Sequence, residues 1–200
     1  ILSNDKFPDF KALTDYIHGL GLKFGIYSSP GATTCGGHVG SYQHEEIDAR
    51  TWERWGVDYL KYDYCGYLDI EKDSKEETIQ EPYIVMRNAL DKVKRDIVFC
   101  VGYGAPNVWN WAAEAGGNQW RTTRDITDEW NVVTAIGTFQ DVCTDATAPG
   151  RNNDPDMLVV GKLGQGWGNK VHDSYLTGDE QYSHISLWCI LSAPLLIGCD

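Results

Sequence analysis

The most constraining feature of the sequence is a repeated alternation of short apolar runs, rich in β-branched and aromatic residues, with longer segments of helical spacing. No linker or low-complexity stretch interrupts it, which is typical of successive βαβ units around a parallel sheet. Strands are expected at 22–27, 57–63, 97–101, 118–122, 157–161 and 194–198. Helices are expected at 10–21, 45–55, 82–94, 108–115, 126–137 and 179–191.

The length of the chain agrees with this count of about six strands. A complete (β/α)₈ barrel has roughly 250 residues, so the 200 residues of this chain hold about six of its eight units. The expected fold is an incomplete (β/α)₈ barrel that forms one domain over residues 1–200. A doubly wound sheet is the competing architecture, but neither GxGxxG nor GxxxxGK[ST] occurs, which disfavours nucleotide binding.

Composition and charge exclude several classes of protein. A net charge of -12 is repelled by nucleic acid and by anionic membranes, and no basic run offsets it. The longest apolar run, 187–199, is interrupted and shorter than the ~20 residues that span a bilayer. Six cysteines without a CxxC pair leave room for one or two disulfides, and five histidines without HxH or HExxH predict no metal site.

Two aspartates stand at places where a barrel carries its active site, the carboxyl ends of strands. Asp63 ends the strand at 57–63, on the same face as Lys61, and Asp125 follows the strand that holds Arg121. Paired carboxylates beside cations are the equipment of glycoside hydrolysis, because one attacks the sugar and the other protonates the leaving oxygen. For Asp125 a purely structural role as a helix N-cap remains open. Aromatic residues near the strand ends could stack on a sugar ring: Tyr27, Tyr62, Tyr64, Tyr103 and Trp120.

Four motifs, in this order, carry a resemblance to a known family: GIYSSPGATTCGG at 25–37, WGVDYLKYDYC at 55–65, WRTTRDI at 120–126 and NDPDMLVVG at 153–161. The chain resembles the α-galactosidases of glycoside hydrolase family 27 over nearly its whole length. Such a resemblance implies a barrel that begins here within its second βα unit and ends at its eighth strand. The first one to two units, with a W-x-D-D motif that grips the sugar, and the last helix would then lie outside these residues.

The resemblance also implies the chemistry. Asp63 would be the nucleophile and Asp125 the general acid/base of a retaining, double-displacement hydrolase acting on terminal α-galactosyl groups. Sugar binding would involve Lys61, Arg121, Tyr103, Asp156 and the Cys35–Cys65 disulfide, with no metal and no cofactor. A disulfide implies an extracellular or periplasmic location.

One segment departs from the family pattern. Val101 and Gly102 replace the usual polar pair at the end of the fifth strand, whereas Tyr103 keeps the aromatic residue. Activity on β-L-arabinopyranosides or α-N-acetylgalactosaminides therefore stays open, as does an inactive carbohydrate-binding relative or a metal-dependent barrel hydrolase. Arg124 would lower the pKa of Asp125 if its side chain points inward.

Overall fold

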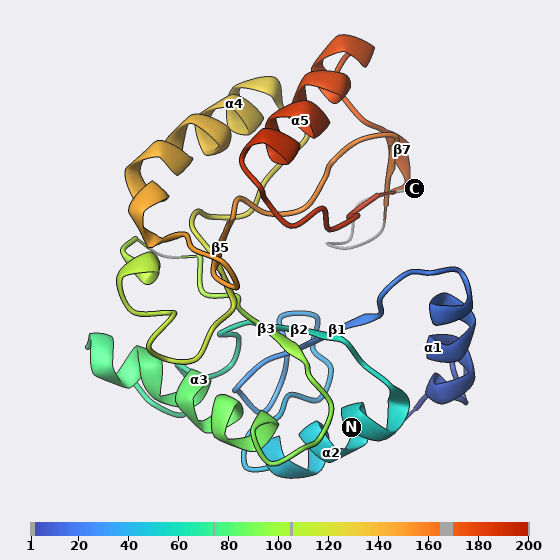
Figure 1. Ribbon diagram of the computed structural model, residues 1–200, viewed down its shortest axis with the longest axis vertical. Coiled ribbons are helices and arrows are strands. Elements are labelled where there is room, and N and C mark those ends of the chain that lie inside the picture. Colours follow the sequence, from blue (N-terminus) through green and yellow to red (C-terminus); the bar gives the residue numbers. More distant parts are fainter. Residues whose placement is uncertain (1–2, 74, 105, 165–169, 200) are drawn as a thin grey trace. The chain divides into compact units, whose positions relative to one another are not determined.

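The computed structural model describes residues 3–73, 75–104, 106–164 and 170–199 (Figure 1). It divides into two compact units. Unit 1 consists of Ile1–Tyr103 and Trp111–Asn118, and unit 2 consists of Gly104–Asn110 and Gln119–Asp200. Each unit buries apolar side chains of its own, so each is described by itself below.

Unit 1 has the predicted alternation of strands and helices. Its elements in chain order are α1 (Phe10–Gly19), β1 (Gly25–Ser28), α2 (Glu45–Trp55), β2 (Tyr59–Tyr62), α3 (Glu76–Leu90) and β3 (Val98–Val101). The three strands lie side by side (Figure 1). They pair in parallel, with Tyr27 opposite Lys61 and Lys61 opposite Cys100. A helix joins each strand to the next, which confirms the βαβ prediction for this part of the chain.

The strand β2 shows why the sequence alternates as it does. Leu60 and Tyr62 are fully buried, and the ring of Tyr62 meets Tyr83 of α3 edge-on at 6.0 Å between ring centres. Lys61 belongs to the opposite face, as the period of two requires. The expected end of α2 is also correct, because Gly56 takes a left-handed φ of 83° that stops the helix.

The helix α3 begins earlier than predicted. The sequence suggested that Pro82 opens this helix, but α3 starts at Glu76 and Pro82 lies inside it. Glu76 and Glu77 occupy the first turn, where negative charge is favoured by the helix dipole. A proline inside a helix removes one hydrogen bond of the ladder and crowds the carbonyl four residues before it. The tertiary packing of the buried Pro82 and Tyr83 outweighs this cost.

In unit 2 the described residues form two parallel strands, an antiparallel strand pair and two α-helices. Its elements are η1 (Val108–Asn110), β4 (Gln119–Arg121), α4 (Trp130–Phe139), η2 (Gln140–Ala146), β5 (Asn152–Asp154), β6 (Lys162–Leu163), β7 (His172–Asp173) and α5 (Gly178–Ile190). Trp120 of β4 pairs with Asn153 of β5. The apolar core includes Val133 of α4, Leu163 of β6 and Trp188 of α5.

Four sequence predictions in the second half of the chain need correction. The segment 108–115 forms a short 3₁₀ helix and turns rather than an α-helix, and the expected strands at 157–161 and 194–198 shrink to one parallel bridge between Leu158 and Ile197. The helix expected at 126–137 starts at Trp130, with Glu129 as its N-cap, so Asp125 is not a helix cap. The antiparallel β6–β7 hairpin was not foreseen.

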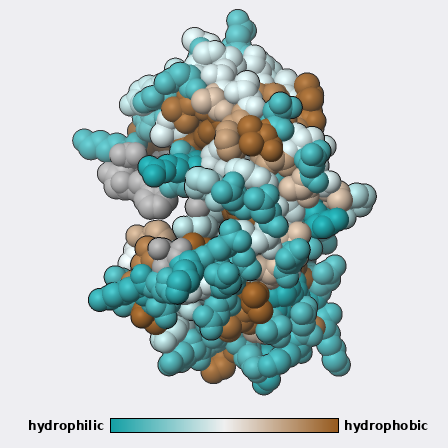
Figure 2. Space-filling view, turned by 90° about the vertical axis from the view of Figure 1, so that its left-hand side faces the viewer, coloured by the Kyte–Doolittle hydropathy of each residue, from teal (hydrophilic) through white to brown (hydrophobic). Residues whose placement is uncertain are grey.

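Some large apolar side chains remain on the surface of each unit, and Figure 2 shows apolar residues gathered at several places on the face it presents. Leu20 and Leu22 are examples in unit 1, and Ile190 and Ile197 in unit 2. Among the described residues no helix is long and apolar enough to cross a membrane.

Candidate active site

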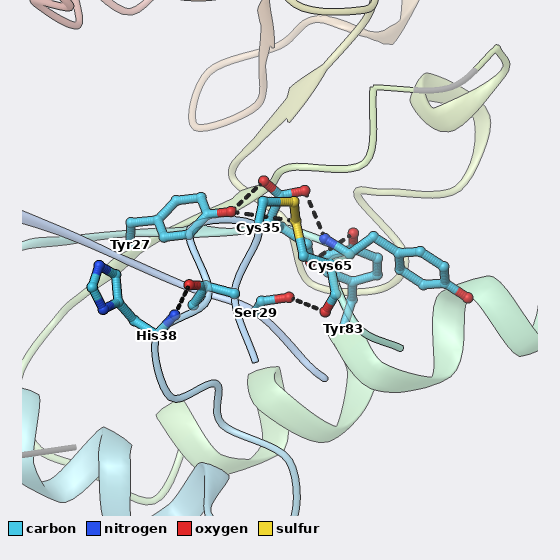
Figure 3. The surroundings of a disulfide bond; sticks show 9 residues. Tyr27, Ser29, Cys35, His38, Cys65 and Tyr83 are labelled. Carbon is cyan, nitrogen blue, oxygen red and sulfur yellow. Dashed lines mark hydrogen bonds between the residues drawn. A yellow bond between two sulfur atoms is a disulfide. The ribbon is translucent and has the colours of Figure 1, made fainter. Parts of the chain in front are cut away.

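Asp63 occupies a fixed position directly after β2. Its backbone N–H donates to the carbonyl of Ser28 at 2.9 Å, which continues the pairing with β1 by one residue. The hydroxyl of Tyr27 donates to Oδ2 of Asp63 at 2.6 Å, and the N–H of Tyr64 donates to Oδ1 at 2.8 Å (Figure 3). Each carboxylate oxygen thus has a donor, and together they set the plane of the group.

Tyr27 is the site residue whose role the sequence did not reveal. The sequence indicates Tyr27 only as one of several aromatic residues that could stack on a sugar. The parallel register sets Tyr27 opposite Lys61, two residues before Asp63 on the same face of the neighbouring strand. Period-two alternation gives the face within one strand, but it does not give the register between two strands, so the contact with Asp63 could not be read from the pattern.

The Cys35–Cys65 disulfide predicted from the family resemblance is present. It joins the loops after β1 and β2 across 30 residues, with Cα atoms 5.2 Å apart (Figure 3). The Sγ of Cys65 lies 3.5 Å from the hydroxyl of Tyr27, so the bridge adjoins the group that holds Asp63. The sulfur atoms of Cys35 and Cys65 also lie near a carboxylate oxygen of Asp63, but sulfurs joined to each other are not the thiolates that bind metals.

Tyr103 contacts Tyr64, the residue that follows Asp63 in the chain. The rings of Tyr103 and Tyr64 meet at 4.8 Å with an angle of 60° between their planes. Burial, reinforced by Tyr103 and Tyr67, raises the pKa of Tyr64 to about 12, so this phenol stays protonated at any physiological pH.

The departure at Gly102 has a steric consequence. A Cβ on Gly102 would lie 2.7 Å from the carbonyl oxygen of Tyr62 and 2.9 Å from the Cα of Asp63. Such distances are shorter than real Cβ contacts. The backbone just after β3 therefore lies too close to the backbone of Tyr62 and Asp63 to leave room for a side chain at position 102. A polar side chain at position 102 would require this backbone to shift.

In unit 2, Arg121 is the centre of a buried charge cluster. It ends β4 with only 4% of its side chain exposed, and its Nη2 donates to Oδ1 of Asp125 at 3.0 Å and forms an ion pair with Oδ2 of Asp156 at 2.9 Å. The carbonyl of Thr123 accepts the second hydrogen bond of this nitrogen at 3.2 Å. Burial alone would lower the pKa of Arg121, but the charges of Asp156, Asp154 and Asp125 outweigh it and raise that pKa. The guanidinium is accordingly a permanent cation beneath Asp125.

Asp125 combines exposure with a fixed orientation. Its side chain is 70% exposed, yet Oδ1 accepts the bond from Arg121. An exposed carboxylate held from below by a buried cation can meet a ligand from solvent without losing its direction. Arg124, which would act on Asp125 only if its side chain pointed inward, is exposed.

Asp156 braces the loop that carries Asp125. Only 2% of Asp156 is exposed, and its Oδ2 accepts from the N–H of Ile126 at 3.0 Å and forms the ion pair with Arg121. Its carbonyl accepts the indole N–H of Trp188 at 2.8 Å, and its φ of 84° is unusual for a residue with a side chain. The cost of this backbone conformation is offset by bonds to β4, to the Asp125 loop and to α5.

The predicted site residues thus form two sets, one in each unit. Asp63 is accompanied in unit 1 by Tyr27, Tyr103 and the disulfide, and β2 places Lys61 on the same face. In unit 2, Asp125 is joined by Arg121 and Asp156.

Comparison with known proteins decides the family. The family profile described as Alpha galactosidase A matches residues 2–200. The chain belongs to this family. An α-galactosidase of Cyamopsis tetragonoloba is 44% identical over 199 residues, which cover 97% of this chain and 43% of that protein. The crystal structure of a Bacteroides fragilis protein described as a putative α-galactosidase/melibiase superposes with a TM-score of 0.83 at 40% identity, covering 96% of this chain and 41% of that one.

A third relative was solved with a sugar. The Saccharomyces cerevisiae α-galactosidase structure with raffinose is 27% identical, with a TM-score of 0.79 over 99% of this chain and 46% of that one. This member of the alpha galactosidase A family therefore spans less than half the length of these relatives. Its fold is the predicted incomplete (β/α)₈ barrel.

Proposed function

We propose that residues 1–200 form part of one catalytic domain, and that they supply both catalytic carboxylates of a retaining hydrolase for terminal α-galactosyl groups. The observation that carries the proposal is how neighbouring groups position the two aspartate side chains. Asp63 is held at both oxygens at the end of β2, and Asp125 is exposed but anchored to a buried arginine. Membership of the alpha galactosidase A family supports the choice of sugar.

In the first step, a carboxylate oxygen of Asp63 attacks the anomeric carbon while Asp125 gives its proton to the glycosidic oxygen. The bond to the leaving group breaks and a glycosyl ester of Asp63 forms. In the second step, Asp125 takes a proton from water, which attacks the same carbon from the face the leaving group left. The ester bond breaks, Asp63 is regenerated, and the two inversions give net retention.

The remaining residues hold substrate or catalytic groups. Lys61 and Tyr103 are proposed to contact the sugar, with Lys61 donating to hydroxyls. Arg121 and Asp156 are nearly inaccessible, which supports a role in orienting Asp125 alongside any contact with the sugar. The two carboxylates perform this reaction without a metal or cofactor. The disulfide supports an oxidising location, extracellular or periplasmic.

The test uses the full-length protein that contains this chain, with p-nitrophenyl α-galactoside as substrate. Asp63→Ala and Asp125→Ala should each lower kcat by at least about 10³-fold. Added azide should rescue both and separate their roles. With Asp63→Ala azide attacks once and gives the β-galactosyl azide, whereas with Asp125→Ala it attacks the glycosyl ester and gives the α-galactosyl azide. A wild-type protein that leaves the substrate uncleaved, or releases β-galactose first, would overturn the proposal.

Specificity for the substituent at C2 of the sugar needs a direct test, because of Gly102. Position 102 carries no side chain and has no room for one, so the polar contact that the family places here is missing. Rates on the p-nitrophenyl α-galactoside, β-L-arabinopyranoside and α-N-acetylgalactosaminide should be compared in one panel. We expect the α-galactoside to be cleaved fastest, and a higher kcat/KM for either of the others would reassign the substrate.

A further inference from the structure

The β6–β7 hairpin is tied to the loop that carries Asp125. The N–H of Tyr175, just after β7, donates to Oδ2 of Asp128 at 2.9 Å. The Nε2 of His172 lies 3.2 Å from the same oxygen. Asp128 is three residues beyond Asp125 in the loop between β4 and α4. The segment 170–176 is therefore fixed against the acid/base loop rather than free in solvent.

His172 is held at both ring nitrogens. Nδ1 lies 3.1 Å from the carbonyl of Lys170, and Nε2 faces Asp128, so both partners are acceptors. The bond to Lys170 and the charge of Asp128 raise the pKa of His172, which agrees with a ring that donates on both sides. These contacts give the imidazole a fixed plane.

Tyr175 lies on that plane and faces solvent. Its ring stacks on His172, with centres 4.8 Å apart and planes 30° from parallel, and 75% of the residue is exposed. The backbone beneath it is firm, because Ser174 bonds to the carbonyls of Gly161 and Val159, and Leu176 is buried. An exposed aromatic ring on a rigid support is the usual platform for the apolar face of a sugar ring.

The position of Tyr175 indicates which part of the substrate its ring would contact. Three residues of chain span at most about 11 Å, so the segment bonded to Asp128 lies close to Asp125. A general acid protonates the oxygen between the scissile sugar and its leaving group. The leaving group therefore lies on the Asp125 side of the bond.

We propose that Tyr175, backed by His172, is the platform for the leaving-group sugar, which makes an oligosaccharide rather than a simple alkyl galactoside the preferred substrate. This inference rests on the function proposed above. It adds a leaving-group subsite formed by His172 and Tyr175, residues outside the set proposed to hold the galactose.

The experiment compares two substrates in the full-length protein that contains this chain. Melibiose has a glucose leaving group, whereas methyl α-galactoside has the same scissile sugar and no second ring. Tyr175→Ala should lower kcat/KM for melibiose about three- to tenfold, mainly through KM, and change that for the methyl glycoside less than twofold. Tyr175→Phe should keep the wild-type ratio, because the ring remains.

Tyr182→Ala is the matched control, since Tyr182 is a similarly exposed tyrosine on α5 of the same unit. It should leave both substrates unchanged. An equal loss on both substrates in Tyr175→Ala, or no loss on either, would overturn the subsite while leaving the proposed function intact. A wild-type protein that cleaves neither substrate would instead overturn the function, and the subsite with it.

Discussion

At the scale of single residues, Asp156 braces the loop that carries Asp125, through an ion pair with Arg121 and a hydrogen bond accepted from the N–H of Ile126. No pattern in the sequence could show this, because its partners lie 30 or more residues away and depend on the final packing.

This role predicts an effect on stability. Asp156→Asn keeps an oxygen that can accept one bond and a residue type that tolerates positive φ, so it removes chiefly the charge facing buried Arg121. The free energy of unfolding should fall by about 1–3 kcal/mol, measured by urea denaturation. Asp125→Asn is the control, because it removes an equal charge from an exposed partner of the same arginine and should cost less than about 0.5 kcal/mol. Equal losses in the two variants would contradict the argument.

At the scale of helices and strands, the predictions succeeded where local signals agree with packing. The end of α2 at Gly56 was correct, whereas the start of α3 was wrong because burial of Pro82 outweighed its local preference. The hairpin was missed because its two strands are only two residues long, too short for a period of two to be recognised. The sequence therefore predicted neither the β6–β7 pair nor the proposed role of Tyr175, which lies just after β7.

The helix α5 carries a group that titrates with folding. His184 is fully buried, accepts a bond from the N–H of Val159 at 3.2 Å and packs edge-on against Trp188. Burial lowers the pKa of His184 from 6.5 to about 4. Since the unfolded chain binds a proton at a higher pH than the folded one, stability is complete above about pH 6.5 and falls as the pH drops towards 4.

His184→Gln tests this dependence, because its amide oxygen can replace Nε2 as the acceptor but cannot be protonated in this range. The stability advantage of the wild type over the variant should shrink between pH 7 and pH 4, by on the order of 3 kcal/mol. Urea denaturation at several pH values measures it. An advantage that stays constant across this range would show that His184 does not contribute to acid unfolding.

At the scale of the whole molecule, the Cys35–Cys65 disulfide adds a covalent contribution to stability. The chain has six cysteines, of which Cys35 and Cys65 are joined, Cys100 and Cys143 are buried thiols, and Cys189 is exposed. The family resemblance gave the pairing, since spacing alone allowed one or two disulfides without choosing among them. The disulfide stabilises the folded protein mainly because a cross-link restricts the conformations of the unfolded chain.

Removing the bridge should therefore destabilise the protein even if the folded state keeps its shape. Closing a loop of 30 residues corresponds to about 3–4 kcal/mol of lost chain entropy in the unfolded state. The double variant Cys35→Ala, Cys65→Ala should lower Tm, and dithiothreitol should lower the Tm of the wild type to a similar value without affecting the variant further. Cys189→Ala, which removes an exposed free thiol, should leave both Tm and its response to dithiothreitol unchanged. If the reductant lowered Tm equally in the double variant, its effect would have to come from elsewhere in the molecule, and the stabilisation assigned to this bridge would be wrong.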